Sequence, residues 1–293
     1  MQKKEEILPY KKIFEFLLWD NCNNNCKFCF QRKNPRLFNQ NQRKNILDDT
    51  ISFIKSDKFD KGSHILICGG EIFDKPTDFP DLNAFFAQID GFMADGTIDL
   101  LYLNTNLIYE DVSGLCFVLD MMKDKFNRLK FTTSYDLYGR FNKKFDETLF
   151  FMNLKWLKEH FPKCNIVVNT ILTKQTCEKI INKEFSIKKF MDEYDCWVNL
   201  IPYIVYDEKM SATRTQIFSA LQIVENENRG YLQRYIPNIC IEQEKDLFIY
   251  RDGDYHFCSC DLSDCGHSIN FKRYSKENSC FCCDLKEMFP DYV

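Results

Sequence analysis

Short apolar runs alternate with amphipathic stretches along the first two thirds of the chain. Six of these runs qualify as strands, at residues 14–19, 64–68, 99–103, 129–133, 165–172 and 196–201. Most of them are continuously apolar, which is typical of parallel strands buried on both faces. Between them, apolar residues recur at helical spacing. Two examples are the sets Leu47, Ile51, Ile54 and Phe150, Leu154, Leu157.

The order of these elements predicts an α/β fold. Six strand–helix alternations indicate a parallel sheet with right-handed crossovers. A closed TIM barrel needs eight such units, so we expect an open, partial (β/α)6 TIM-like barrel. Its functional site should lie at the carboxyl ends of the strands.

Composition divides the chain into three expected parts. The partial barrel is assigned to residues 1–205 and a helical linker to residues 206–239. Residues 240–293 are rich in Cys, Asp, Tyr and Phe, with turn residues such as Asp252 and Gly253. We expect these residues to form a small Cys-rich extension that needs a metal to hold its shape.

Charge and hydropathy indicate whether nucleic acid or a membrane is an expected partner. The net charge of −4 gives no general attraction for nucleic acid, although a local basic cluster keeps that option open. No apolar run approaches the roughly 20 residues that span a bilayer. The first residues lack the apolar core of a signal peptide. We expect a cytoplasmic protein with no membrane partner.

Fifteen cysteines are the unusual feature of the composition. In a cytosolic chain, cysteines favour metal binding or catalysis over disulfides. Five are scattered singly and are expected to be small buried residues, namely Cys68, Cys116, Cys164, Cys177 and Cys196. The others gather near residue 25 and after residue 239.

Cys22, Cys26 and Cys29 directly follow the first expected strand. Spacings of four and three on a loop let three thiolates converge on one face of a cluster. A structural zinc or an ordinary cubane site has four ligands, and the nearest downstream candidates are His64 and Cys68. Three ligands leave one iron open for chemistry. A chance grouping or a zinc loop is the alternative.

This spacing, with Phe28 directly before the last cysteine, resembles the motif of the radical S-adenosylmethionine (SAM) enzymes. The resemblance implies a [4Fe–4S] cluster on Cys22, Cys26 and Cys29, with SAM bound at the open iron. The reduced cluster of such enzymes cleaves SAM to methionine and a 5′-deoxyadenosyl radical, which abstracts a hydrogen atom. A reductant such as flavodoxin or ferredoxin is implied as a partner.

Gly69, Gly70 and Glu71 end the second expected strand. Glycines let a backbone approach closely, and a carboxylate can pair with a cationic amine. The tripeptide resembles the family's Gly-Gly-Glu motif, which binds the SAM amino group. Ile72 departs from the proline that often follows.

Asn104, Thr105 and Asn106 end the third expected strand, where relatives often carry Thr-Asn-Gly. Leu107 stands in place of the usual glycine. The resemblance implies that Asn104 contacts the cofactor. Ordinary turn chemistry is the alternative for these residues.

Four further polar residues are cofactor candidates by the same resemblance. Ser134 and Asp136 end the fourth expected strand, where contacts to the SAM ribose are implied. Arg140 follows, where related enzymes have an arginine for the methionine carboxylate. Asn169 is expected to face the cleft. Turns and helix N-caps are the alternative for each.

The carboxyl-terminal cysteines form a second group. Two separated pairs of thiolates can enclose a metal or cluster, here Cys240, Cys258, Cys280 and Cys283. Their spacing resembles the twitch unit, a shortened relative of the SPASM extension, which implies one auxiliary [4Fe–4S] cluster. Zinc is the alternative, with Cys260, Cys265, Cys282, His256 and His267 as further candidate ligands. A purely structural tail is a third option.

The function implied is hydrogen-atom abstraction, with the cofactor supplying the difficult step. Enzymes with twitch or SPASM units often modify peptides or proteins, so we expect such a substrate and a possible separate peptide-recognition protein. The alternatives are oxidation of a sugar or other alcohol, modification of a nucleotide or RNA, and an Fe–S electron carrier. No residue is singled out as a catalytic base.

Overall fold

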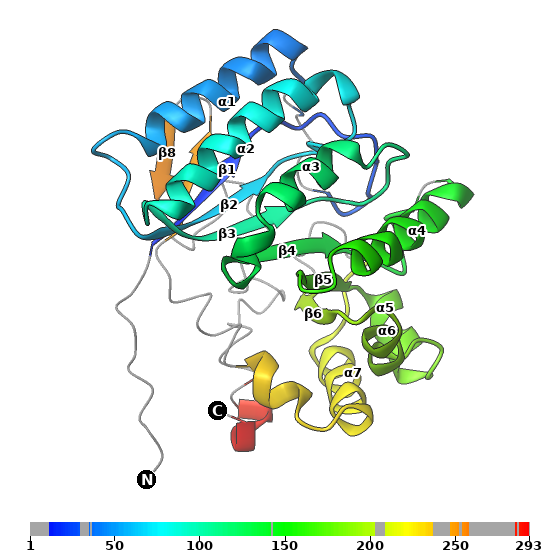
Figure 1. Cartoon of the computed structure of the whole chain (residues 1–293). Coiled ribbons are helices and arrows are strands. Elements are labelled where there is room, and N and C mark those ends of the chain that lie inside the picture. The colour runs from blue at the N-terminus through cyan, green and yellow to red at the C-terminus, as the bar shows by residue number, and fades with distance from the viewer. Residues whose placement is uncertain are drawn as a thin grey trace.

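In the computed structural model, the residues that the structure describes form an open eight-stranded sheet (Figure 1). The structure describes residues 12–29, 35, 37–141, 143–202, 209–236, 247–251, 254–257, 285 and 287–292. The strand order is β6-β5-β4-β3-β2-β1-β7-β8. The strands are β1 (Ile13–Leu17), β2 (Ser63–Cys68), β3 (Ile98–Asn104), β4 (Leu129–Ser134), β5 (Asn165–Leu172), β6 (Trp197–Pro202), β7 (Leu247–Arg251) and β8 (Asp254–Phe257).

Strands β1 to β6 are all parallel, which confirms the predicted α/β class and the six predicted strands. The sheet is open, as expected of a partial barrel. Two further strands extend it beyond β1. Strand β7 pairs parallel to β1, and β8 returns antiparallel to β7. Their sequences lie inside the Cys-rich region and were not predicted as strands.

Helices connect the parallel strands. The α-helices are α1 (Gln40–Ile54), α2 (Phe79–Ala94), α3 (Ser113–Met121), α4 (Lys144–His160), α5 (Lys174–Ile181), α6 (Ile187–Tyr194) and α7 (Arg214–Glu227). Short 3-10 turns are η2 (Pro76–Asp78), η3 (Lys123–Arg128) and η5 (Pro290–Tyr292). Capping boxes begin α1 at Asn39 and Gln42, and α7 at Thr213 and Gln216. Each box satisfies backbone N–H groups that the first turn leaves without helical partners.

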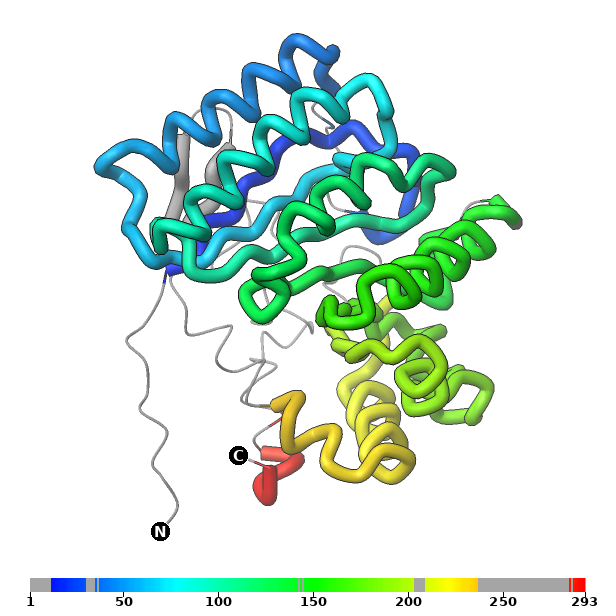
Figure 2. The backbone as a smooth tube through the Cα atoms, in the orientation of Figure 1, coloured from blue at the N-terminus to red at the C-terminus, as the bar shows by residue number. Residues whose placement is uncertain are grey.

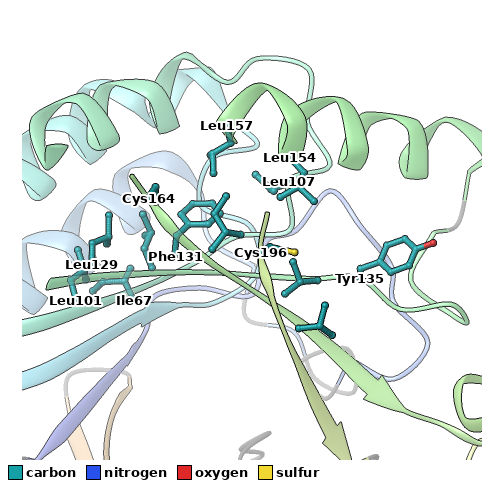
Figure 3. Close-up of a cluster of buried hydrophobic side chains, with 14 of the residues drawn as sticks. Ile67, Leu101, Leu107, Leu129, Phe131, Tyr135, Leu154, Leu157, Cys164 and Cys196 are labelled. Atoms are coloured by element: carbon teal, nitrogen blue, oxygen red, sulfur yellow. The ribbon is translucent and has the colours of Figure 1, made fainter. Parts of the chain in front are cut away.

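The core lies between the sheet and the helices that cover one of its faces (Figures 1 and 2). Figure 3 shows Leu154 and Leu157 of α4 above Phe131 of β4. The residues predicted to form the apolar faces of α1 and α4 are all buried. Alternate strand residues point into this core, and burying each large apolar side chain contributes roughly 1.5–3 kcal/mol.

The last described residues pack beside α7 (Figure 2). The rings of Phe218 and Phe289 lie 6.0 Å apart, and the Tyr292 hydroxyl donates to Glu225 at 3.3 Å. Arg214 pairs with Glu287 at 3.0 Å. The carboxyl-terminal segment therefore docks on the helix that follows β6. Within the described residues, every helix is too short or too polar to cross a membrane.

Candidate functional site

The loop that carries Cys22, Cys26 and Cys29 leaves the carboxyl end of β1. Cys22 is exposed, Cys26 and Cys29 are half-buried, and none of the three forms a disulfide. The Lys27 amide donates to the carbonyl of Gly139 at 2.7 Å, which ties this loop to the β4–α4 loop. The three cysteines thus lie at the end of the sheet where the sequence predicted a site.

The donor set of this loop fits an iron–sulfur cluster, because three cysteine thiols that form no disulfide share one short loop. As the side chains stand, no three His, Cys, Asp or Glu residues in the described part of the chain are grouped closely enough to hold a metal ion. Although Cys22 is exposed as a residue, the loops packed around its sulfur desolvate the thiol and raise its pKa to about 12, and desolvation also raises the pKa of Cys26. A metal would have to displace these protons.

Gly69 and Gly70 allow the end of β2 to touch the chain that enters the cysteine loop. A Cβ on Gly70 would lie 1.9 Å from the carbonyl oxygen of Asn21, and one on Gly69 would lie 2.6 Å from that of Trp19. Gly69 also has a φ of +155°, which favours glycine. The amides of Gly70 and Glu71 donate to Trp19 and Asn21 at 2.6 and 2.8 Å. These glycines therefore position the backbone just before Cys22.

Glu71 is buried and joins β2 to the turn after β3. Its Oε1 accepts from the Phe73 amide at 3.0 Å and from the Thr105 hydroxyl at 2.8 Å. Its Oε2 accepts from the Asn106 amide at 2.5 Å. Burial raises the pKa of the carboxyl to about 7, although these three hydrogen bonds oppose the shift. In this geometry Glu71 positions two loops; its predicted contact with a ligand amine stays a prediction.

The turn after β3 places Asn106 against the cysteine loop. The Asn106 side chain donates to Cys22 Sγ at 3.7 Å and to Asn23 Oδ1 at 2.8 Å. Leu107 follows with a φ of +57°, a left-handed conformation that suits the glycine of the related motif. Leu107 is fully buried, and Asn153 donates to its carbonyl at 3.0 Å. Core packing therefore maintains a strained leucine at the glycine position.

Asp136 and Arg140 form a buried pair in the β4–α4 loop. Arg140 Nε lies 2.8 Å from Asp136 Oδ2, and Asp136 Oδ1 accepts from the Ile171 amide at 2.7 Å. Burial raises the pKa of the Asp136 carboxyl, and the Arg140 charge opposes that rise. The guanidinium lies 5.6 Å from the centroid of the Phe28 ring. Arg140 is thus brought to the cysteine loop, whereas both Asp136 oxygens already have partners.

The sheet face opposite the helices carries a polar row near the strand ends. Register pairs Asn104 with Thr132, Ser134 with Asn169, and Asn169 with Asn199. All five are half-buried, unlike their apolar neighbours on the helix-covered face. Thr132 donates to Asn104 and Asn199 donates to Asn169, each at 3.3 Å. Three predicted cofactor residues, Asn104, Ser134 and Asn169, therefore share one face.

Two residues at the site, Asn23 and Asn24, were not predicted from the sequence. The backbone amide of Asn24 donates to Cys22 Sγ and its side chain to Cys26 Sγ, both at 3.4 Å. The Asn23 side chain donates to the carbonyl of Ile108. Three consecutive asparagines between two of the cysteines were the available signal, because asparagine amides can donate to sulfur.

The remaining cysteines lie either in the described part of the fold or outside the described residues. Cys68, Cys164, Cys177 and Cys196 are buried as expected, whereas Cys116 is half-buried. Seven residues of the auxiliary-site predictions lie outside the described residues: Cys240, Cys258, Cys260, Cys265, Cys280, Cys282 and Cys283. His267 lies there too. The auxiliary cluster and its zinc alternative therefore stay predictions.

Comparison with known proteins supports the fold. No protein-family model and no curated protein matches the sequence. Among solved structures, the chain is similar to the native anaerobic sulfatase-maturating enzyme anSMEcpe with bound AdoMet (TM-score 0.63, 13% identity, 96% of each chain covered). It is also similar to the hexahistidine-tagged form with bound AdoMet (TM-score 0.61, 13% identity, 96% of this chain and 93% of that one). The described residues therefore share the open α/β fold of this AdoMet-binding enzyme.

Proposed function

We propose that this protein is a radical SAM enzyme. One observation carries the proposal: three cysteines with the family's spacing lie, without disulfides, on the β1–α1 loop of a fold shared with an enzyme solved with AdoMet. In open α/β sheets, ligands bind at the carboxyl ends of the strands. The cysteine loop leaves that end, and the turns after β2, β3 and β4 contact it.

Cys22, Cys26 and Cys29 would hold a [4Fe–4S] cluster, with SAM at the fourth iron. When bound, this pair supplies a reductively generated 5′-deoxyadenosyl radical. The chain's own residues then position the cofactors. The close contacts of Gly69 and Gly70 fix the chain before Cys22, and the buried Glu71 holds the turn that contains Asn106.

Direct contacts to SAM are assigned to groups near the cysteine loop. Arg140 pairs with Asp136 and lies over Phe28, so its guanidinium is close enough to the cysteine loop to bind a carboxylate there. Asn104, Ser134 and Asn169 present amide and hydroxyl groups on the polar row, where they suit a ribose or an amino-acid end. Glu71 and Asp136 hold the turns in place through the hydrogen bonds they already make.

A peptide or protein is the proposed substrate class. Two observations support it: the structural relative is named for maturing a sulfatase, which is a protein, and Asn199, which extends the polar row beyond the three residues assigned to SAM, carries an amide that suits peptide groups. A reductant such as flavodoxin or ferredoxin would supply the electron. The auxiliary cluster on Cys240, Cys258, Cys280 and Cys283 would accept an electron from a substrate radical. Oxidation of a sugar or alcohol is the second candidate, because the same row can bind hydroxyls.

The experiment first tests whether SAM binds at the cluster and then tests which class of substrate donates the hydrogen atom. Anaerobically reconstituted protein is reduced, and its electron paramagnetic resonance (EPR) spectrum is recorded with and without SAM. A SAM-dependent change of the spectrum supports the proposal, and an unchanged spectrum contradicts it. Deuterated peptides and deuterated sugars are then compared as donors of label to 5′-deoxyadenosine. Label from the sugars alone would overturn the peptide assignment.

A further inference from the structure

We infer that Asn106 and Asn24 donate hydrogen bonds to the cluster thiolates and raise the reduction potential of the cluster. The inference rests on the proposed function, because it assigns a role toward the cluster that Cys22, Cys26 and Cys29 would hold. It concerns residues that do not touch the reacting atoms. Asn106 acts on the sulfur of Cys22, and Asn24 acts on the sulfurs of Cys22 and Cys26.

The orientation of the Asn106 amide is fixed from both ends. Its Oδ1 accepts from the Ile108 amide at 2.7 Å, so Nδ2 must face the other way. One Nδ2 hydrogen then points to Asn23 Oδ1 at 2.8 Å and the other to Cys22 Sγ at 3.7 Å. Asn106 is buried, so this amide has little freedom to turn elsewhere.

The Asn106 backbone is held as firmly as its side chain. Its amide donates to the buried Glu71 carboxylate at 2.5 Å, and the next residue is the left-handed Leu107. Asn153 donates to the carbonyls of Leu107 and Tyr109 at 3.0 and 2.8 Å. A strained turn persists only where its surroundings determine it, and these contacts do so.

Asn24 approaches the same sulfurs from within the loop. Its backbone amide lies 3.4 Å from Cys22 Sγ, and its side-chain amide lies 3.4 Å from Cys26 Sγ. The Cys22 sulfur therefore accepts from Asn24 and Asn106, and the Cys26 sulfur accepts from Asn24. Hydrogen bonds to the sulfurs are among the factors that set the potential of an iron–sulfur cluster. Each N–H dipole stabilises the extra negative charge of the reduced cluster, so these donors make the cluster easier to reduce.

The first test compares two variants with a control. Asn106→Ser keeps an oxygen acceptor for the Ile108 amide but loses the donor to Cys22. Asn106→Asp also keeps the acceptor and adds a negative charge. Gln40→Ser removes an amide that binds the carbonyl of Thr77 instead of a sulfur. In redox titrations followed by EPR, we expect the potential to fall in Asn106→Ser, to fall further in Asn106→Asp, and to stay unchanged in Gln40→Ser.

A second test has its main readout in the wild-type chain. It therefore gives an answer even if the variants fail to assemble a cluster. The protein is labelled with ¹⁵N in the asparagine side-chain amides, and the reduced cluster is examined by pulsed EPR. We expect a ¹⁵N coupling that weakens in Asn106→Ser. Absence of any such coupling in the wild type would overturn the inference, as would an Asn106→Ser potential equal to that of the wild type.

Failure of the inference can be told from failure of the proposed function. Wild-type protein that assembles no [4Fe–4S] cluster, or that does not cleave SAM, refutes the proposed function. Wild-type protein that does both, but shows neither the coupling nor the shift in potential, refutes this inference alone.

Discussion

At the scale of single residues, Gly70 is a position where the neighbouring backbone leaves no room for a side chain. We predict that Gly70→Ala lowers the free energy of unfolding by about 3 kcal/mol, the upper end of the usual cost of overpacking, because its Cβ would overlap the Asn21 carbonyl. The same change should reduce iron incorporation, since Asn21 precedes Cys22. Chemical unfolding and iron analysis measure the two effects.

Gly91→Ala is the matched control. Gly91 lies on the exposed side of α2, and a Cβ there meets no atom within 4 Å. Alanine should stabilise this helix by about 0.5–1 kcal/mol and leave iron content unchanged. Equal losses in the two variants would show that the contact with Asn21 has no special role.

Glu71 makes stability depend on pH. Its folded-state pKa is raised to about 7, so the folded chain holds this proton more tightly than the unfolded chain does. Below the usual pKa of a carboxyl group, the protonated Glu71 contributes its full stabilisation of the folded chain. That contribution is lost as the pH rises through the folded-state pKa of about 7. At 1.36 kcal/mol per pH unit, the loss is roughly 3 kcal/mol.

Glu71→Gln removes this titration. We predict that the free energy of unfolding of wild type falls, relative to that of the variant, as pH rises from about 5 to 8. Chemical unfolding of both proteins at several pH values checks it. A constant difference across that range would mean that Glu71 titrates as an ordinary surface carboxyl.

At the scale of elements, a buried ion pair joins α1 to the turn before α2. Arg43 Nε and its terminal nitrogen contact the two Asp78 oxygens at 2.7 and 2.8 Å. We predict that Arg43→Leu costs about 3–5 kcal/mol, because it leaves the Asp78 charge buried without its partner. The double variant Arg43→Leu with Asp78→Leu should recover much of that loss in the same unfolding experiment. A double variant no more stable than the single one would contradict this explanation.

Elements β1 to β6 could be predicted from sequence because each is a short apolar run between amphipathic helices. The face of α1 formed by Leu47, Ile51 and Ile54 was predictable for the same reason. Strands β7 and β8 could not be, since the helical linker expected over residues 206–239 gives no sign that the chain returns to the sheet beside β1. Their pairing depends on a contact between the two ends of the chain, which local patterns do not encode.

The candidate site was predictable in part. The cysteine spacing and the glycines after β2 could be recognised as motifs, but the partners of Glu71 could not. The contact of Asn106 with Cys22 requires the ends of three neighbouring strands to meet and a leucine to adopt a left-handed conformation. A left-handed conformation normally favours glycine, so the leucine itself does not predict it. Core packing around Leu107 decides the conformation instead.

At the scale of the whole molecule, the account depends on reductive cleavage of SAM at the β1–α1 loop. The most direct measurement is the amount of 5′-deoxyadenosine formed by anaerobically reconstituted protein with dithionite and SAM. The wild-type chain should form it, and a variant with Cys22, Cys26 and Cys29 all changed to alanine should form none above background. Equal amounts from both proteins, or none from a wild-type chain that carries its cluster, would contradict the account.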